Sequence, residues 1–151
     1  MSLAGGLVID ASVAIKWLID EDGSDTALSL RDADLAAPAL LRIEVGNVLR
    51  TLAARQAIAP AEARDLFAFF QEAPVAIADP DDALERRALD LALDLGHPIY
   101  DCVYLALAER MDRRLVTADL RFARALGSTD HAARILTLAD VERTRPSGGS
   151  F

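Results

Sequence analysis

Cysteine, histidine and long apolar runs are scarce in this chain of 151 residues. Cys102 is its single cysteine, which excludes an internal disulfide and fits a reducing compartment. The two histidines, His97 and His131, have no second histidine or cysteine at the spacing of a zinc site, so we assign neither to a metal. No apolar run approaches the roughly 20 residues of a membrane-spanning helix, and the first residues do not resemble a secretory signal. We therefore expect a cytoplasmic protein that does not enter a membrane.

The composition is that of a folded, acidic protein. Hydrophobic residues make up 52% of the chain, which is enough for a normal core in one domain. There are 24 acidic against 16 basic residues, and the net charge is −8. This balance argues against a protein that coats nucleic acid by bulk electrostatics. It does not exclude an enzyme that meets RNA locally, because bound cations can reverse the sign of an acidic pocket. It also makes a basic protein partner plausible.

Short apolar segments alternate with segments of helical periodicity. We expect strands at 7–10, 35–37, 75–78, 114–118 and 135–137, and helices at 12–20, 24–33, 39–56, 60–74, 81–95 and 100–111, with a short one ending near 127. Ser24 is the expected N-cap of its helix. The alternation predicts an α/β fold: a short, mostly parallel central sheet with helices on both faces.

We expect a single domain over residues 7–141. Residues 1–6 would form a leader that is disordered or derived from an expression vector, and residues 142–151 a flexible tail rich in glycine and serine.

Four acidic residues occur where folding alone would not place them. Asp10 ends the first apolar run, Glu44 lies beside the apolar stripe of a helix, Asp101 opens a helix on its apolar side, and Asp119 closes a strand. Ligands of parallel sheets bind beyond the carboxyl ends of the strands. Asp10 and Asp119 should therefore lie on the ligand side, and they would be close if their strands are neighbours.

Each acid also has a simpler interpretation. Asp10 and Asp119 could cap the helices that follow them, and for either one alone this is the better interpretation. Asp101 could interact with the positive end of a helix dipole. Glu44 is far from either helix end, and no basic residue lies four positions away to pair with it. The four acids together in one small domain are harder to explain by these roles.

A shared acidic site would suit a hard divalent cation. Mg²⁺ takes oxygen ligands, and it can activate water and bind phosphate. The hydroxyls of Ser12 and Thr117 could orient a carboxylate or a metal-bound water, although hydrogen bonds in turns explain them equally well. Asn47, one helical turn from Glu44, could contact substrate or orient Glu44. If the acids share a site, the pKa of at least one should be raised.

Four segments together resemble a known family. They are VIDAS at 8–12, EVGNVL at 44–49, YDCVYLALA at 100–108 and LVTAD at 115–119. In this order and spacing they resemble the motifs of PIN-domain ribonucleases, and the length is similar to that of the VapC toxins of bacterial toxin–antitoxin pairs. The resemblance covers residues 7–138, nearly the whole chain.

The resemblance implies a PIN-like fold and an endoribonuclease that depends on Mg²⁺ or Mn²⁺. Asp10, Glu44, Asp101 and Asp119 would be its catalytic, metal-binding acids. Ser12 and Thr117 match the supporting hydroxyl positions. An activated water would attack an RNA phosphodiester and leave 5′-phosphate and 3′-hydroxyl ends. The resemblance also implies a homodimer and a small VapB-like antitoxin that places a basic side chain in the acidic pocket.

Two alternatives remain open. A receiver-like signalling domain also has an acidic pocket and uses Mg²⁺, but it needs adjacent acids after the first strand and a late lysine. Here Asp10 stands alone, and no lysine follows Lys16. The second alternative is a catalytically inactive binding protein with an acidic metal pocket, because an intact ligand set does not prove turnover.

Overall fold

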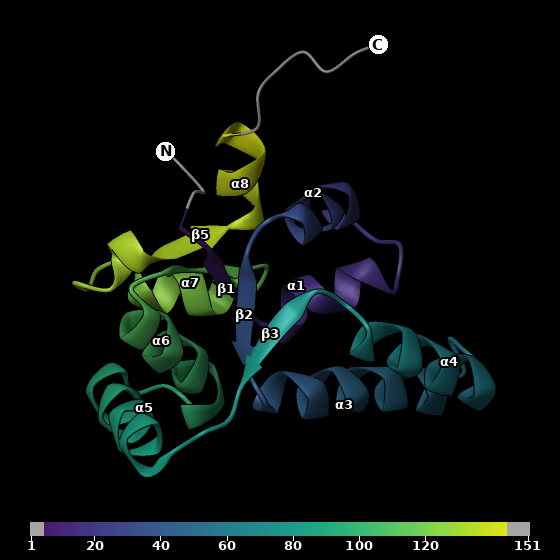
Figure 1. Ribbon diagram of the computed structural model, residues 1–151, viewed down its shortest axis with the longest axis horizontal. Helices are drawn as coiled ribbons and strands as arrows, with labels where there is room; N and C mark the ends of the chain where they lie inside the picture. The colour runs from purple at the N-terminus through teal and green to yellow at the C-terminus, as the bar shows by residue number, and fades with distance from the viewer. Residues whose placement is uncertain (1–4, 145–151) are drawn as a thin grey trace.

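A five-stranded parallel sheet forms the centre of the molecule in the computed structural model, which describes residues 5–144 (Figure 1). The strands are β1 (Leu7–Ile9), β2 (Leu35–Pro38), β3 (Val75–Ala78), β4 (Arg114–Thr117) and β5 (Ile135–Thr137). Their order is β3-β2-β1-β4-β5, and every neighbouring pair is parallel. The predicted α/β fold with a parallel central sheet is confirmed.

Helices connect the strands, because parallel neighbours need crossover connections. They are α1 (Ala11–Ala14), α2 (Ser24–Ser29), α3 (Leu40–Ala54), α4 (Pro60–Gln71), α5 (Asp82–Leu95), α6 (Ile99–Met111), α7 (Leu120–Leu126) and α8 (Leu138–Thr144), with 3₁₀ turns η1 (Ile15–Trp17), η2 (Leu30–Asp32) and η3 (Ala132–Arg134). Figure 1 shows α5, α6 and α7 on one side of the sheet and α1, α3 and α4 on the other. Both faces of the sheet are therefore covered, as predicted.

Much of the hydrophobic core lies between the centre of the sheet and α6. All three residues of β1 are buried, as expected for a central strand covered on both faces. Helix α6 packs on β1, β2 and β4, and its residues 104–108 are all buried. It is apolar around most of its circumference because the sheet covers one side and α5 the other. This places α6, with Asp101 in its first turn, at the centre of the molecule.

Two boundaries near the start of the chain differ from the prediction. Strand β1 ends at Ile9, because Asp10 leaves the sheet to cap α1. The N-cap of α2 is Gly23, not Ser24, which is the first helical residue. Gly23 has φ of +88°, a conformation that favours glycine, and no side chain caps the helix. The Ser24 hydroxyl is used elsewhere: it donates to the carbonyl of Ile19 and accepts from the amide of Glu21.

The end of the described chain also differs. The expected flexible tail from residue 142 is wrong for its first three residues, because α8 continues to Thr144. Val141 is buried, and the Thr26 hydroxyl of α2 donates to Glu142. These contacts join α8 to the core, so the helix depends on tertiary packing that a short sequence pattern does not reveal. Residues 145–151 of the tail and 1–4 of the leader lie outside the described residues.

None of the helices within residues 5–144 has the length and apolar character needed to cross a bilayer.

Candidate active site

The four acidic residues line one pocket. Asp10, Glu44, Asp101 and Asp119 surround a cavity of about 210 Å³, together with Ala11, Ser12, Ile15 and Val48. Because β1 and β4 are neighbours, with Ile9 opposite Val116, their carboxyl ends bring Asp10 and Asp119 to the same edge of the sheet. Helices α3 and α6 supply the other two acids. Residues from four separate segments thus meet in one place.

Asp10 is the most enclosed of the four, with 5% of its surface exposed. Its Oδ1 accepts hydrogen bonds from the Ser12 hydroxyl at 2.5 Å and the Ser12 amide at 3.0 Å, and its Oδ2 accepts one from the Thr117 hydroxyl at 2.5 Å. Asp10 also caps α1 through the amides of Ser12 and Val13. Capping and membership of the pocket are therefore compatible roles. The hydroxyls of Ser12 and Thr117 both contact Asp10.

Burial and crowding act on the carboxyl groups. Burial raises the pKa of Asp10 from 3.8 to about 6; the hydrogen bonds from Ser12 and Thr117 oppose this rise, and the negative charge of Asp101 adds to it. Burial also raises the pKa of Glu44, with a further contribution from Asp101. The prediction that at least one acid has a raised pKa is confirmed. Crowded carboxylates repel one another, so a bound cation would stabilise their ionised forms.

Glu44 is held by a residue that the sequence did not indicate. The hydroxyl of Tyr104 donates to Oε1 of Glu44 at 2.5 Å. Burial and the bond to Glu44 keep the pKa of Tyr104 well above its ordinary value of 10, so the phenol remains a donor. A tyrosine on the apolar face of a buried helix could have indicated this, because a buried phenol needs a hydrogen-bond partner.

Asp101 has a histidine partner. Nε2 of His97 lies 2.7 Å from Oδ2 of Asp101, and the imidazole ring packs on Phe122 with centroids 4.9 Å apart. His97 precedes α6, so helical spacing does not predict this pair, and the contact arises from the turn that leads into the helix. The cap of α6 is Pro98, without a side-chain hydrogen bond, so Asp101 does not cap its helix.

Of the two remaining predicted residues, Asp119 lines the pocket and Asn47 does not. Asp119 lines the pocket and also caps α7, accepting from the amides of Arg121 at 2.9 Å and Phe122 at 3.3 Å. Asn47 is exposed and is not among the residues that line the pocket. The residue that follows Glu44 along the pocket side of α3 is Val48, four positions on, because four residues advance a helix by little more than one turn. The predicted role of Asn47 toward the pocket has no support in this geometry.

The donor set fits a hydrated divalent ion. All four acidic side chains offer oxygen, the ligand that Mg²⁺ prefers. Within residues 5–144, no three histidine, cysteine, aspartate or glutamate side chains form a ready-made ligand group. Mg²⁺ commonly keeps several waters and takes only one or two carboxylates directly, so an open pocket with four carboxylates around it suits this ion.

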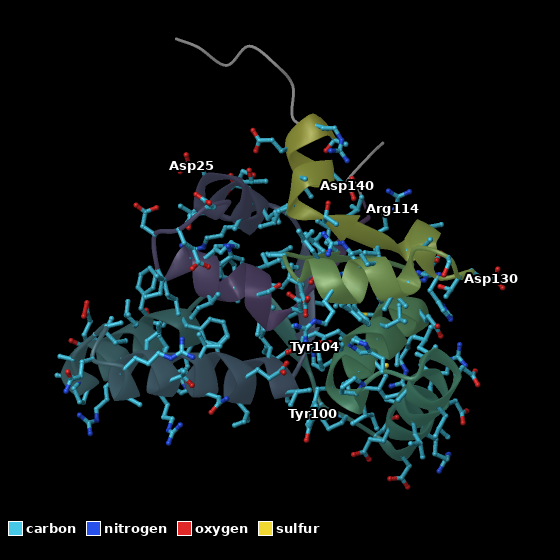
Figure 2. All side chains as sticks on the ribbon, turned by 180° about the vertical axis from the view of Figure 1, so that it is seen from behind. Asp25, Tyr100, Tyr104, Arg114, Asp130 and Asp140 are labelled. Atoms are coloured by element: carbon cyan, nitrogen blue, oxygen red, sulfur yellow. The ribbon has the colours of Figure 1, made fainter. Side chains whose placement is uncertain are left out.

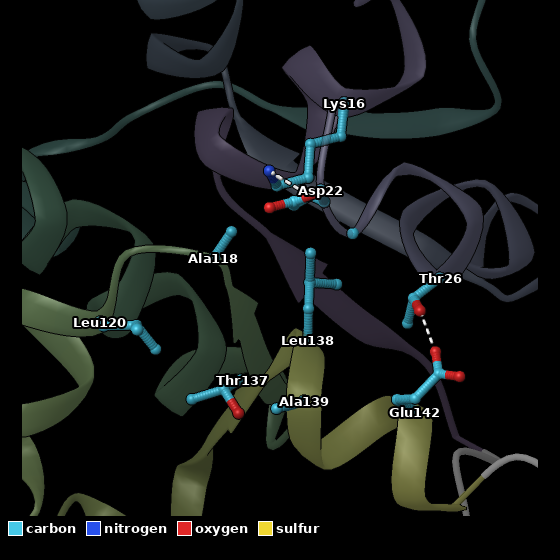
Figure 3. A pocket seen from close by; sticks show the side chains of 10 residues that line it. Lys16, Asp22, Thr26, Ala118, Leu120, Thr137, Leu138, Ala139 and Glu142 are labelled. Carbon is cyan, nitrogen blue, oxygen red and sulfur yellow. Dashed lines mark hydrogen bonds between the residues drawn. The ribbon is translucent and has the colours of Figure 1, made fainter. Parts of the chain in front are cut away.

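A larger cavity lies next to the acidic pocket. It measures about 470 Å³ and is lined by Ala118 and Leu120, the neighbours of Asp119, and by residues of the α2 and α8 regions (Figure 3). Lys16 lies on its wall, where its Nζ donates to Oε1 of Glu21 at 3.0 Å and to the carbonyl of Asp22 at 2.7 Å. Asp119 lines the small acidic pocket, and the residues on either side of it in the chain line the larger cavity.

The chain is similar to several known proteins. The family model described as the PIN domain matches residues 7–126. The VapC ribonuclease Mb0985 of Mycobacterium bovis is 33% identical over 117 residues, covering 78% of this chain and 88% of that protein. Ribonuclease VapC12 of Mycobacterium tuberculosis is 32% identical over 134 residues, covering 88% of this chain and 99% of that protein.

Solved structures share the fold. PAE2754 from Pyrobaculum aerophilum has a TM-score of 0.68 at 22% identity, covering 91% of this chain and 88% of that one. A toxin–antitoxin complex from Klebsiella pneumoniae has a TM-score of 0.64 at 13% identity, covering 87% and 97%. VapC20 of Mycobacterium tuberculosis, described as a sarcin–ricin loop cleaving toxin, has a TM-score of 0.62 at 15% identity, covering 79% and 94%.

Proposed function

This chain belongs to the PIN-domain family, among its VapC-like ribonucleases, and from that premise we propose that it is a toxin endoribonuclease that uses Mg²⁺ or Mn²⁺ to hydrolyse RNA phosphodiester bonds. One observation carries the proposal: Asp10, Glu44, Asp101 and Asp119 line a single pocket at the carboxyl edge of the sheet. An acidic pocket attracts a divalent cation, and the cation in turn makes the pocket attractive to phosphate.

The residues of the pocket have distinct roles in this proposal. Asp10, Glu44, Asp101 and Asp119 would hold the ion directly or through its waters. When bound, a divalent ion supplies a Lewis acid that activates water and offsets charge on the phosphate. Ser12 and Thr117 fix both oxygens of Asp10, so that this carboxylate meets the ion in one orientation.

We assign Glu44 the further role of accepting a proton from the attacking water. Burial raises its pKa, and a carboxylate with a raised pKa is a stronger base. Tyr104 occupies Oε1, which leaves Oε2 for this role. Cleavage would leave 5′-phosphate and 3′-hydroxyl ends.

The proposal includes a protein partner. A small VapB-like antitoxin would bind the chain and place a basic side chain in the acidic pocket. The similarity to a toxin–antitoxin complex and the net charge of −8 support such a basic partner. We also propose that the protein acts as a homodimer in the cytoplasm.

The direct test is cleavage of RNA by the purified protein with and without Mg²⁺ or Mn²⁺. We expect metal-dependent cleavage that EDTA abolishes and that Asp10→Asn and Asp101→Asn remove while the fold is retained. Asp65→Asn, at an exposed position of α4, is the matched control and should cleave normally. Cleavage that persists in EDTA and in both pocket variants would overturn the proposal. Metal binding without turnover would identify the inactive binding protein instead.

A further inference from the structure

Tyr104 is a buried residue with one polar atom, and that atom points to the acidic pocket. Only 1% of its surface is exposed, and it lies on α6 among apolar residues. Its hydroxyl donates to Oε1 of Glu44 on α3, a residue 60 positions earlier in the chain. Figure 2 shows Tyr104 in the interior of the molecule and Tyr100, one turn earlier on the same helix, at its periphery. A phenylalanine would fill the same space in the core, so the hydroxyl itself calls for an explanation.

Glu44 needs an anchor if it is to remain in the pocket. It shares the cavity with Asp10, Asp101 and Asp119, and like charges in one small cavity repel each other. A glutamate side chain has several rotatable bonds and can turn toward solvent to relieve this repulsion. Among the hydrogen bonds of the described residues, the one from Tyr104 is what holds its carboxylate. A hydrogen bond to a charged carboxylate is stronger than one between neutral groups.

The same helix also carries Asp101. Asp101 and Tyr104 are three residues apart on α6 and therefore lie on the same side of the helix. The Tyr104 bond thus ties the Glu44 carboxylate to the helix that supplies a second acid of the site. This contact therefore links α3 and α6 beside the pocket that Glu44 and Asp101 share.

We propose that Tyr104 is a positioning residue, whose hydroxyl holds Glu44 in the acidic pocket in the orientation needed for metal binding and catalysis. This inference rests on the proposed function of the pocket. Tyr104 acts through Glu44 and does not itself touch the ion or the RNA.

The test compares Tyr104→Phe with Tyr100→Phe. Each variant loses one hydroxyl from the same helix, but Tyr100 is 61% exposed. The readouts are Mn²⁺ affinity, measured by calorimetric titration without RNA, and the kcat and KM of RNA cleavage at fixed metal. For Tyr104→Phe we expect Mn²⁺ affinity to fall by about 10-fold or more. We also expect kcat to fall, with partial recovery at higher metal concentration, while KM stays close to that of the wild type. Tyr100→Phe should match the wild type in every readout.

A double-mutant cycle separates positioning from a general structural effect. Glu44→Gln removes the charge that Tyr104 is proposed to hold. On that background, adding Tyr104→Phe should cause no further loss of Mn²⁺ affinity, because the two residues act as one unit. An equal loss on both backgrounds would show that Tyr104 acts through the core, and it would overturn the inference.

The inference and the proposed function fail in different ways. A wild-type protein that neither binds Mn²⁺ nor cleaves RNA would contradict the proposed function, and the inference with it. A wild-type protein that does both, alongside a folded Tyr104→Phe variant with the same affinity and kcat, would contradict the positioning role alone.

Discussion

Thr117 and Asp10 lie side by side at the ends of adjacent parallel strands, and the Thr117 hydroxyl donates to Oδ2 of Asp10 at 2.5 Å. Thr117 is fully buried, and its hydroxyl oxygen also accepts from the amide of Asp119 at 3.0 Å. One threonine therefore contacts two of the four acids of the pocket. The pairing of β1 with β4 sets this relationship, so the sheet itself determines the geometry of the site.

We expect Thr117→Val to destabilise the protein by about 2 kcal/mol, because valine keeps the shape but leaves a buried carboxylate oxygen without its donor. Urea unfolding of the metal-free protein measures this. Thr51→Val is the control: Thr51 donates to the carbonyl of Asn47 on the exposed side of α3, and its loss should change the free energy of unfolding by less than about 0.5 kcal/mol. Equal, small effects of the two substitutions would contradict the importance of the Thr117 contact.

The stability of the metal-free protein should depend on pH through Asp10. The folded-state pKa of about 6 lies above the ordinary value of 3.8, so between these values the folded protein binds more protons than the unfolded chain. The free energy of unfolding contributed by Asp10 therefore falls as pH rises through this window, and the unfavourable effect is complete above pH 6. The gap between 3.8 and about 6 corresponds to a penalty of roughly 3 kcal/mol.

Asp10→Asn tests this, because asparagine carries no charge at any of these pH values. In EDTA, we expect the variant to be more stable than the wild type at pH 8, and the difference to shrink steadily toward pH 4. Urea unfolding across this pH range provides the measurement. The exposed Asp65→Asn substitution should follow the wild type throughout. An Asp10→Asn variant that is less stable than the wild type at pH 8 would contradict a buried, destabilising charge.

The sequence predicted the parts of the site that depend on local patterns. The alternation of strand and helix patterns predicts a parallel sheet. Asp10 and Asp119 each follow an apolar run directly, so the sequence places both at the carboxyl edge of that sheet. Their closeness depended on whether the two strands are neighbours, which the order β1-β4 establishes. Tyr104 could not be assigned to Glu44 in this way, because their contact arises from the packing of α3 near α6 across 60 positions of sequence. Asn47 was predicted from sequence proximity alone, and the rotation of the helix brings Val48 to the pocket in its place.

Divalent metal should raise the melting temperature of the wild type. A ligand that binds only the folded state stabilises it by mass action, by about 2.7 kcal/mol at 100 times its Kd. The effect should be larger at pH 8 than at pH 5, because the metal needs the ionised form of Asp10, whose pKa is about 6. Thermal unfolding with MgCl₂ or MnCl₂ against EDTA measures this, with Asp65→Asn as a variant that should respond like the wild type. A melting temperature that does not change at millimolar metal would count against the site.

His97 should contribute to metal binding through its Nε2 atom and to stability through the packing of its ring. Its Nε2 contacts Oδ2 of Asp101, whereas its ring packs on Phe122. His97→Ala removes both contacts, but His97→Gln can still present an amide nitrogen near the position of Nε2. We expect both variants to lose stability in urea, since both lose the ring. Only His97→Ala should weaken Mn²⁺ affinity markedly, by about 10-fold, because an outer partner that orients a ligand typically contributes this much.

The control is His131→Ala. In the wild type, Nδ1 of His131 lies 3.6 Å from Oε1 of Glu109, and its removal should leave Mn²⁺ affinity unchanged. If alanine and glutamine at position 97 both preserve Mn²⁺ affinity, His97 stabilises the fold without orienting Asp101.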